Sequence, residues 1–165
     1  MAMTALGGTP AQTNGELPAT GSVAPDATLH DGNLQPVTLS SFRGKSVVLN
    51  IFPSVDTGVC AQSVRTFNER LAAVEGLVVI NVSLDLPFAQ KRFCGAEGIE
   101  RSITLSAFRS SFAEDFGVLL TSSAFEGLTA RAVVVLDAEG VVQHAELVPE
   151  IGQEPDYDAA FAALG

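Results

Sequence analysis

One cysteine stands where an apolar stretch gives way to a helical pattern. Residues 46–51 form an apolar run typical of a strand, and Cys60 follows after a short loop. Apolar residues then recur at helical spacing, at Val64, Phe67, Leu71 and Val74. We therefore predict that Cys60 lies at or just inside the first turn of a helix. Free backbone N–H groups and the positive end of the helix dipole favour an anion there, so the sulfur is expected to form a nucleophilic thiolate readily.

Pro53 and Thr57, in the loop that precedes Cys60, strengthen this interpretation. Pro53 removes a backbone donor and stiffens the loop. Thr57, three residues before Cys60, carries a hydroxyl that can donate and accept, and it can reach over the sulfur. A lone cysteine is most often a small buried hydrophobic residue. With a proline, a threonine and a helix start at this spacing, we instead interpret Cys60 as a nucleophile.

Composition and charge limit the kinds of partner. The chain has 165 residues, enough for one domain with a core, and no apolar run near the length of a membrane span. Its 9 basic and 19 acidic residues give a net charge of −10, with no Lys or Arg before Arg43 or after Arg131. This balance argues against nucleic acid or membrane as a partner and against a secretory signal. We expect a cytoplasmic protein, with the periplasm as the alternative.

The remaining metal-ligating and thiol residues do not form a known pattern. The two cysteines and two histidines, His30, Cys60, Cys94 and His144, match no zinc-finger spacing. Two cysteines are also too few for a disulfide scaffold. If they pair in a reducing compartment, the bond is expected to be transient and catalytic. These spacings therefore predict no zinc site.

Hydrophobic periodicity predicts one α/β domain over residues 26–165. We expect strands at 46–52, 77–84, 103–105, 131–136 and 141–147, and helices at about 59–74, 87–94 and 155–164. A short helix is expected after a capping box at Ser111–Glu114, ending at Gly117. Residues 27–29 and 36–39 should form a hairpin, and residues 1–25 a mobile arm or a weak hairpin. This order predicts a central mixed sheet with helices on both faces.

The residues around Cys60 also resemble a known signature. The run Asn50–Cys60 resembles the active site of the peroxiredoxins, and in particular of the bacterial thiol peroxidases, an atypical two-cysteine subgroup. The resemblance implies a thioredoxin-like fold with an N-terminal β-hairpin extension. It also implies that the Cys60 thiolate attacks one peroxide oxygen, giving a sulfenic acid and water or an alcohol. Pro53 and Thr57 are the matching residues of the signature.

The segment around the second cysteine resembles the same subgroup. On its own, Cys94 is most simply a free cysteine on a helix. Residues 85–98, however, resemble the segment that carries the resolving cysteine of thiol peroxidases. The resemblance implies that Cys94 attacks the sulfenic acid and forms a Cys60–Cys94 disulfide. Because the cysteines lie on different predicted helices, we expect their sulfurs to be apart until both segments unwind, which Gly58 and Gly95 would ease.

A cation is the last expected part of the site. Arg131 opens a predicted strand, where an arginine is usually a solvated strand end. The surrounding run 127–133 resembles the family segment whose arginine lies against the reactive sulfur. The resemblance therefore implies that Arg131 stabilises the thiolate and holds the peroxide. We expect Arg65 and Glu69 to pair on an exposed helix face, and Asp56 to be a turn residue.

The resemblance implies partners as well: a hydroperoxide substrate, thioredoxin as reductant and a second copy in a homodimer. It also implies that the protein needs no cofactor, whether metal, haem or flavin. The apolar residues Phe52, Val55, Val59 and Phe125 favour organic hydroperoxides over hydrogen peroxide. Two alternatives remain. A thiol–disulfide oxidoreductase is disfavoured because the chain has no Cys-x-x-Cys. A redox-sensing binding module would be oxidised once at Cys60 without turning over.

Overall fold

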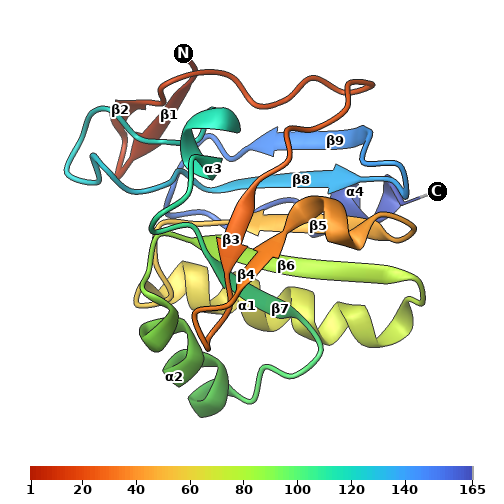
Figure 1. Cartoon of the computed structure of the whole chain (residues 1–165). Helices are drawn as coiled ribbons and strands as arrows, with labels where there is room; N and C mark the ends of the chain where they lie inside the picture. Colours follow the sequence, from red (N-terminus) through yellow and green to blue (C-terminus); the bar gives the residue numbers. More distant parts are fainter. Residues whose placement is uncertain (165) are drawn as a thin grey trace.

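A seven-stranded mixed sheet runs through the middle of the computed structural model, which describes residues 1–164 (Figure 1). The strand order is β4-β3-β7-β6-β5-β8-β9. The strands are β3 Thr28–His30, β4 Pro36–Thr38, β5 Ser46–Ile51, β6 Leu77–Ser83, β7 Ile103–Ser106, β8 Ala132–Leu136 and β9 Val142–Leu147. The central strands β5, β6 and β7 are parallel to one another, whereas β8 pairs antiparallel with β5. Strands β5 and β8 are buried along almost their whole length, which explains their largely apolar sequences.

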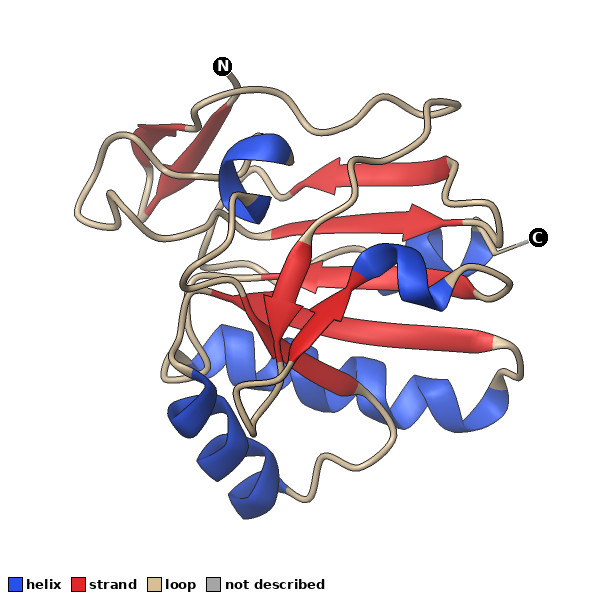
Figure 2. Cartoon of the chain, viewed as in Figure 1, coloured by secondary structure: helices blue, strands red, loops and turns tan. Residues whose placement is uncertain are grey.

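The helices cover both faces of this sheet (Figure 2). They are α1 Gly58–Arg70, α2 Pro87–Glu97, α3 Phe112–Asp115 and α4 Tyr157–Ala162, with 3₁₀ turns at Leu39–Phe42 and Leu71–Ala73. On one face, Phe67 of α1 and Phe161 of α4 pack with Val48 and Val133 of the sheet. On the other face, Phe112 and Phe116 around α3 pack on alternate residues of β5, β6 and β8. The period-two alternation of side chains thus separates two apolar layers.

The first residues form a hairpin of their own. Strands β1 Met3–Leu6 and β2 Thr9–Gln12 pair antiparallel around Gly7 and Gly8, both of which have positive φ. Glycine reaches this conformation without steric cost. The predicted N-terminal hairpin is therefore present. No helix within residues 1–164 is both long and apolar enough to cross a membrane.

Several local predictions need correction. The capping box at Ser111 is wrong, because its hydroxyl donates to the Asp115 carboxylate and caps no backbone N–H. The helix at Cys60 begins at Gly58 and ends at Arg70, where a 3₁₀ turn takes over. Helix α2 continues through Gly95 to Glu97, and β8 begins one residue after Arg131.

The expected ion pair between Arg65 and Glu69 is also wrong. Arg65 instead contacts Glu97 at the end of α2, with an N–O distance of 3.2 Å. The tertiary approach of α2 to α1 supplies this partner, which the spacing along one helix does not reveal. Asp56 lies in a turn, as predicted, and faces Arg92 of α2 at 3.6 Å.

Candidate active site

Cys60 is the third residue of α1 and is fully buried. The N–H of Ala61 donates to the Thr57 carbonyl, the first hydrogen bond of the helix. The N–H groups of Gly58, Val59 and Cys60 have no acceptor within residues 1–164. The sulfur therefore lies in the first helical turn, where unpaired donors and the helix dipole favour negative charge.

The guanidinium of Arg131 lies against this sulfur. Its Nη2 donates to Cys60 Sγ at 3.1 Å, and its Nε donates to the Ile151 carbonyl at 2.7 Å. The pairing of strands explains why Arg131 lies beside Cys60. Ile51 of β5 pairs with Ala132 of β8, so the residues just beyond this pair lie at the edge of the sheet where α1 begins. Sequence-distant segments thus bring a cation to the cysteine.

The burial of Arg131 has an electrostatic consequence. Its side chain is only 1% exposed, and no carboxylate within residues 1–164 forms an ion pair with it. A buried cation without a counterion is costly. Among the described residues, this guanidinium donates to the Cys60 sulfur and to the Ile151 carbonyl, so its positive charge lies directly against the sulfur.

Arg131 keeps one free donor. Its Nη1 is buried and has no hydrogen-bond partner among the described residues. Arg131 also lines a pocket of about 130 Å³ beside the start of α1. The pocket is formed by Leu6, Thr57, Gly58, Val59, Phe125, Arg131, Ile151 and Gly152. A small molecule with an oxygen acceptor fits the chemistry of this lining, which is apolar apart from Arg131, Thr57 and backbone groups.

Thr57 and Pro53 lie in the loop between β5 and α1. The hydroxyl of Thr57 donates to the Ser54 carbonyl at 3.3 Å, and Thr57 lines the pocket. No hydrogen bond joins this hydroxyl to Cys60 in the structure, although the sequence suggested that it reaches over the sulfur. Pro53 is buried, and the residue before it is held by the Thr129 hydroxyl, which donates to the Phe52 carbonyl at 2.6 Å.

Cys94 lies on α2 and is half-buried. Both cysteines are free, and Cys94 Sγ donates to Thr104 Oγ1 at 3.3 Å. Burial raises the pKa of the Cys94 thiol above its ordinary value, although the Thr104 hydrogen bond opposes the shift. Cys94 packs against the apolar cluster that contains Cys60 and Phe52. The structure therefore brings both cysteines to one cluster without joining them.

Comparison with known proteins identifies the family. Residues 19–161 match the Redoxin family. The thiol peroxidase of Mycobacterium tuberculosis (strain ATCC 25618 / H37Rv) is 61% identical over 165 residues, covering 100% of this chain and 99% of the relative. This chain belongs to the thiol peroxidases of the redoxin family. A thiol peroxidase of Corynebacterium glutamicum is 52% identical over 164 residues, 99% of each chain.

Solved structures agree with the family assignment. The peroxiredoxin-like protein from Aquifex aeolicus superposes with a TM-score of 0.93 at 38% identity, covering 99% of this chain and 96% of the other. The thiol peroxidase from Chromobacterium violaceum has a TM-score of 0.90 at 24% identity, covering 97% and 93%, which supports the fold alone. The predicted thioredoxin-like fold is confirmed. As a thiol peroxidase, the chain is an enzyme that acts on a peroxide with a thiol reductant.

Residues that no sequence signal singled out also shape the thiol peroxidase site. The Asp85 carboxylate accepts from the Ser54 hydroxyl at 2.7 Å and from the Val55 N–H at 2.9 Å. Asp85 thereby pins the loop that leads into α1, whereas in the sequence it stood out only as the first residue of the segment 85–98 around Cys94. Ile151 acts through its backbone carbonyl, which no side-chain pattern can reveal.

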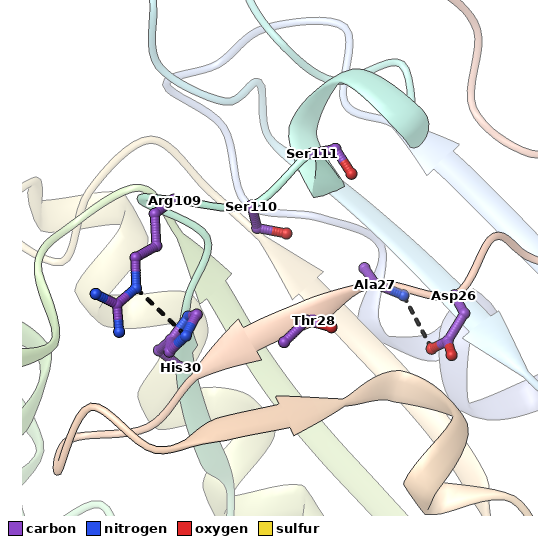
Figure 3. A pocket seen from close by; sticks show the side chains of 7 residues that line it. All are labelled: Asp26, Ala27, Thr28, His30, Arg109, Ser110 and Ser111. Carbon is purple, nitrogen blue, oxygen red and sulfur yellow. Dashed lines mark hydrogen bonds between the residues drawn. The ribbon is translucent and has the colours of Figure 1, made fainter.

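A hollow larger than the pocket at the start of α1 lies elsewhere on the molecule (Figure 3). It has a volume of about 370 Å³ and is lined by residues of β3 and of the segment before α3. Figure 3 shows Arg109 pointing toward His30, and its Nε donates to His30 Nε2 at 3.3 Å. No cysteine lines this hollow. The pocket at the start of α1 differs from this hollow in that its lining includes Arg131, which donates to Cys60 Sγ.

Proposed function

We propose that Cys60 is the peroxidatic nucleophile of a hydroperoxide reductase. Its thiolate attacks one oxygen of ROOH, the O–O bond breaks, and the products are a Cys60 sulfenic acid and an alkoxide that leaves as ROH after taking a proton. The proposal rests on one contact, the 3.1 Å hydrogen bond from Arg131 to Cys60 Sγ, made by a buried guanidinium that keeps Nη1 free. Nη1 and the first-turn N–H groups are available to stabilise charge on the two oxygens.

The second step uses Cys94. Its thiol attacks the Cys60 sulfenic acid, forms the Cys60–Cys94 disulfide and releases water. The shared apolar cluster of the two cysteines supports this pairing. A dithiol protein such as thioredoxin then reduces the disulfide and becomes oxidised in turn. Thr57 and Pro53 act as positioning residues of the loop before Cys60.

The preferred substrates are organic hydroperoxides. Leu6, Val59, Phe125 and Ile151 give the pocket beside Arg131 an apolar wall, and an alkyl group gains free energy on leaving water against such a wall. Of the four residues that suggested this preference, Val59 and Phe125 line the pocket. Phe52 and Val55 are buried in the cluster behind it.

The oligomer and the compartment complete the proposal. We infer a homodimer by analogy with the family, and a reducing compartment, the cytoplasm rather than the periplasm, because recycling needs a reduced dithiol protein. Analytical ultracentrifugation tests the dimer directly: a single species at the monomer mass would refute it.

Intact mass after one equivalent of peroxide tests the chemistry. The wild-type chain should lose two hydrogens, the Cys94→Ser variant should gain one oxygen, and the Cys60→Ser variant should remain unchanged. Steady consumption of peroxide with a thioredoxin system separates the enzyme from a redox sensor that is oxidised once. Unchanged mass in the wild type, or retention of activity by Cys60→Ser, would refute the proposed function.

A further inference from the structure

Polar side chains cross the apolar sheet directly beneath α1. Asn50 of β5 pairs in register with Asn81 of β6, and Asn81 pairs with Thr104 of β7. Asn50 and Asn81 have no exposed surface. Amides are expensive to bury, so a row of them in the centre of a sheet calls for a specific role.

The row is hydrogen-bonded to the Cys60 turn at one end. Asn50 Nδ2 donates to Asn81 Oδ1 at 3.0 Å and to Ser63 Oγ at 3.3 Å. The buried hydroxyl of Ser63 in turn donates to the Cys60 carbonyl at 2.8 Å. Asn50 Oδ1 has no hydrogen-bond partner among residues 1–164, so within this part of the chain the Nδ2 contacts orient the amide.

The row is hydrogen-bonded to Cys94 at the other end. Asn81 Nδ2 donates to Ser102 Oγ at 2.9 Å and to Thr104 Oγ1 at 3.4 Å. Thr104 Oγ1 also accepts from Cys94 Sγ at 3.3 Å. A continuous set of side-chain contacts therefore joins the first turn of α1 to the second cysteine.

Disulfide formation must break this set at the Cys94 end. The S–H proton that binds Thr104 is lost when Cys94 Sγ bonds to Cys60 Sγ and water leaves. Any unwinding of the first turn of α1 likewise releases the Cys60 carbonyl from Ser63. The Ser63 hydroxyl left behind at one end is buried and the Thr104 hydroxyl at the other end is half-buried. Because the two are linked through the buried amides of Asn50 and Asn81, breaking one contact weakens the hold of the others.

We propose that Ser63, Asn50, Asn81 and Thr104 form one latch that holds both cysteine segments in the reduced fold and sets the rate of disulfide formation. The inference rests on the proposed role of Cys94 as the resolving cysteine. None of the four residues lines the pocket beside Arg131, so the latch does not alter the attack of Cys60 on peroxide. They are positioning residues for the second step.

The latch also determines how much sulfenic acid is lost to a second peroxide. A Cys60 sulfenic acid that waits for Cys94 can react with another ROOH, giving a sulfinic acid and ROH. Slower disulfide formation allows more of this reaction. Loosening the latch should therefore protect Cys60 from overoxidation.

Rapid-mixing kinetics on Ser63→Ala, Thr104→Val and the double variant test the proposal. Each single variant should form the disulfide about fivefold faster than the wild type, the value for one ordinary hydrogen bond. The sulfenic acid should form at the wild-type rate. Two independent fivefold effects would multiply to an acceleration of about twenty-five-fold. Because the latch acts as one unit, the acceleration in the double variant should be far smaller than that product. Unchanged disulfide rates, or single effects that multiply, would overturn the latch.

Two controls separate the latch from a general loss of packing. Thr104→Ser restores the hydroxyl and should return the disulfide rate to that of the wild type. Thr13→Val makes the same change as Thr104→Val at a buried hydroxyl of the N-terminal segment and should not change the rate. If the wild type forms no disulfide at all, the proposed function fails. If it forms one and the variants do not differ from it, the latch alone fails.

Discussion

At the scale of single residues, the site depends on how Arg131 divides its donors. Nε is fixed by the Ile151 carbonyl, Nη2 meets the sulfur, and Nη1 is left free. Only a planar guanidinium can fill the first two positions at once and still present a third donor. The guanidinium charge therefore lies against the sulfur, and the planar group keeps its third donor for a further acceptor.

Replacing Arg131 should slow the first step and leave the fold intact. Arg131→Met removes the charge and the donors, so the rate constant for Cys60 with peroxide should fall about 10²–10³-fold, as when a preorganised donor is lost. The rate constant of Arg131→Lys should lie between those of the wild type and Arg131→Met, because an ammonium keeps the charge but cannot donate in the fork geometry of a guanidinium. Stopped-flow measurement checks both. The exposed Arg109→Met is the matched control, and a rate for Arg131→Met within about twofold of the wild type would contradict the assigned role.

The raised pKa of Cys94 predicts how its reactivity depends on pH. An ordinary cysteine thiol has a pKa of about 8.5, and burial raises the pKa of Cys94 above its ordinary value. In folded Cys60→Ser, alkylation of Cys94 by iodoacetamide should rise about tenfold per pH unit up to pH 8.5 without levelling off, since only the thiolate reacts. Because the pKa of Cys94 is higher in the folded chain than in the unfolded chain, the unfolded thiol ionises first as the pH rises. The free energy of unfolding should therefore fall with rising pH in this range. A plateau below pH 8.5 would disprove the shift.

At the scale of elements, two irregular segments position the reactive residues. Asp85 ties the loop before α1 to the end of β6. The N-terminal hairpin ties down the segment after β9: Ile151 N–H donates to the Ala5 carbonyl, and Glu150 accepts from Gly7 and Gly8. Since Ile151 holds Arg131, the hairpin supports the site from outside the matched family region.

The loop contacts of Asp85 can be tested by Asp85→Asn. The amide keeps the shape of the carboxylate but cannot accept on both sides, so the Val55 N–H or the Ser54 hydroxyl loses its partner. The loss of one charge-assisted hydrogen bond should lower stability by about 1–3 kcal/mol and the peroxide rate about tenfold. Chemical denaturation and stopped-flow kinetics measure the two effects. Loss of stability with an unchanged peroxide rate would limit Asp85 to a folding role.

The hairpin's contribution to substrate choice can be tested by Leu6→Ala. Leu6 is part of the apolar wall of the pocket, and shortening it removes contact with a bulky alkyl group. The rate ratio of cumene hydroperoxide to hydrogen peroxide should fall about tenfold, mainly through the bulky substrate. Met3→Ala, on an exposed residue of the same hairpin, should leave the ratio unchanged. An unaltered ratio in Leu6→Ala would remove the hairpin from the substrate site.

At the scale of the whole molecule, the apolar packing between α1, α4 and the sheet lies apart from the region around Cys60 and Arg131. The face shared by α1 and α4 is sealed by aromatic contacts, with Phe67 stacked on Phe161 at a centroid distance of 6.0 Å. The cysteines, Arg131 and the pocket lie toward the start of α1, among a different set of apolar residues. Losses in one region need not reach the other.

Phe161→Ala tests this separation. Truncating a partly buried aromatic side chain should cost about 2 kcal/mol and lower the melting temperature by about 4–8 °C in a chain of this size. The peroxide rate constant at 25 °C should stay as in the wild type, because α4 does not line the pocket. The exposed Phe88→Ala should leave the melting temperature unchanged. A large loss of rate in folded Phe161→Ala would show that the two regions are not independent.

Most of the order of elements was predictable because its causes are local. Apolar runs and helical spacing predicted β5, α1, β6 and α4 to within a few residues, and the N-terminal residues formed one of the two predicted alternatives. The errors also have local explanations. The helix α2 was expected over residues 87–94, but a glycine within a helix costs only about 1 kcal/mol and the helix continues through Gly95 to Glu97. The partner of Arg65 was missed because it lies on another helix.

The sequence by itself determined that Cys60 lies in the first turn of a helix that follows a buried strand, because strand, turn and helix signals all lie within about twenty residues of it. Only the tertiary structure decided what surrounds the sulfur. Arg131 is 71 residues away along the chain, and the contact depends on the antiparallel pairing of β8 with β5. Non-local contacts also place the Ile151 carbonyl beside Arg131, Leu6 in the wall of the pocket, and Asn50 next to Asn81 in the amide row. Backbone groups and non-local packing carry no mark in a local pattern, so sheet topology alone brings them to the cysteine.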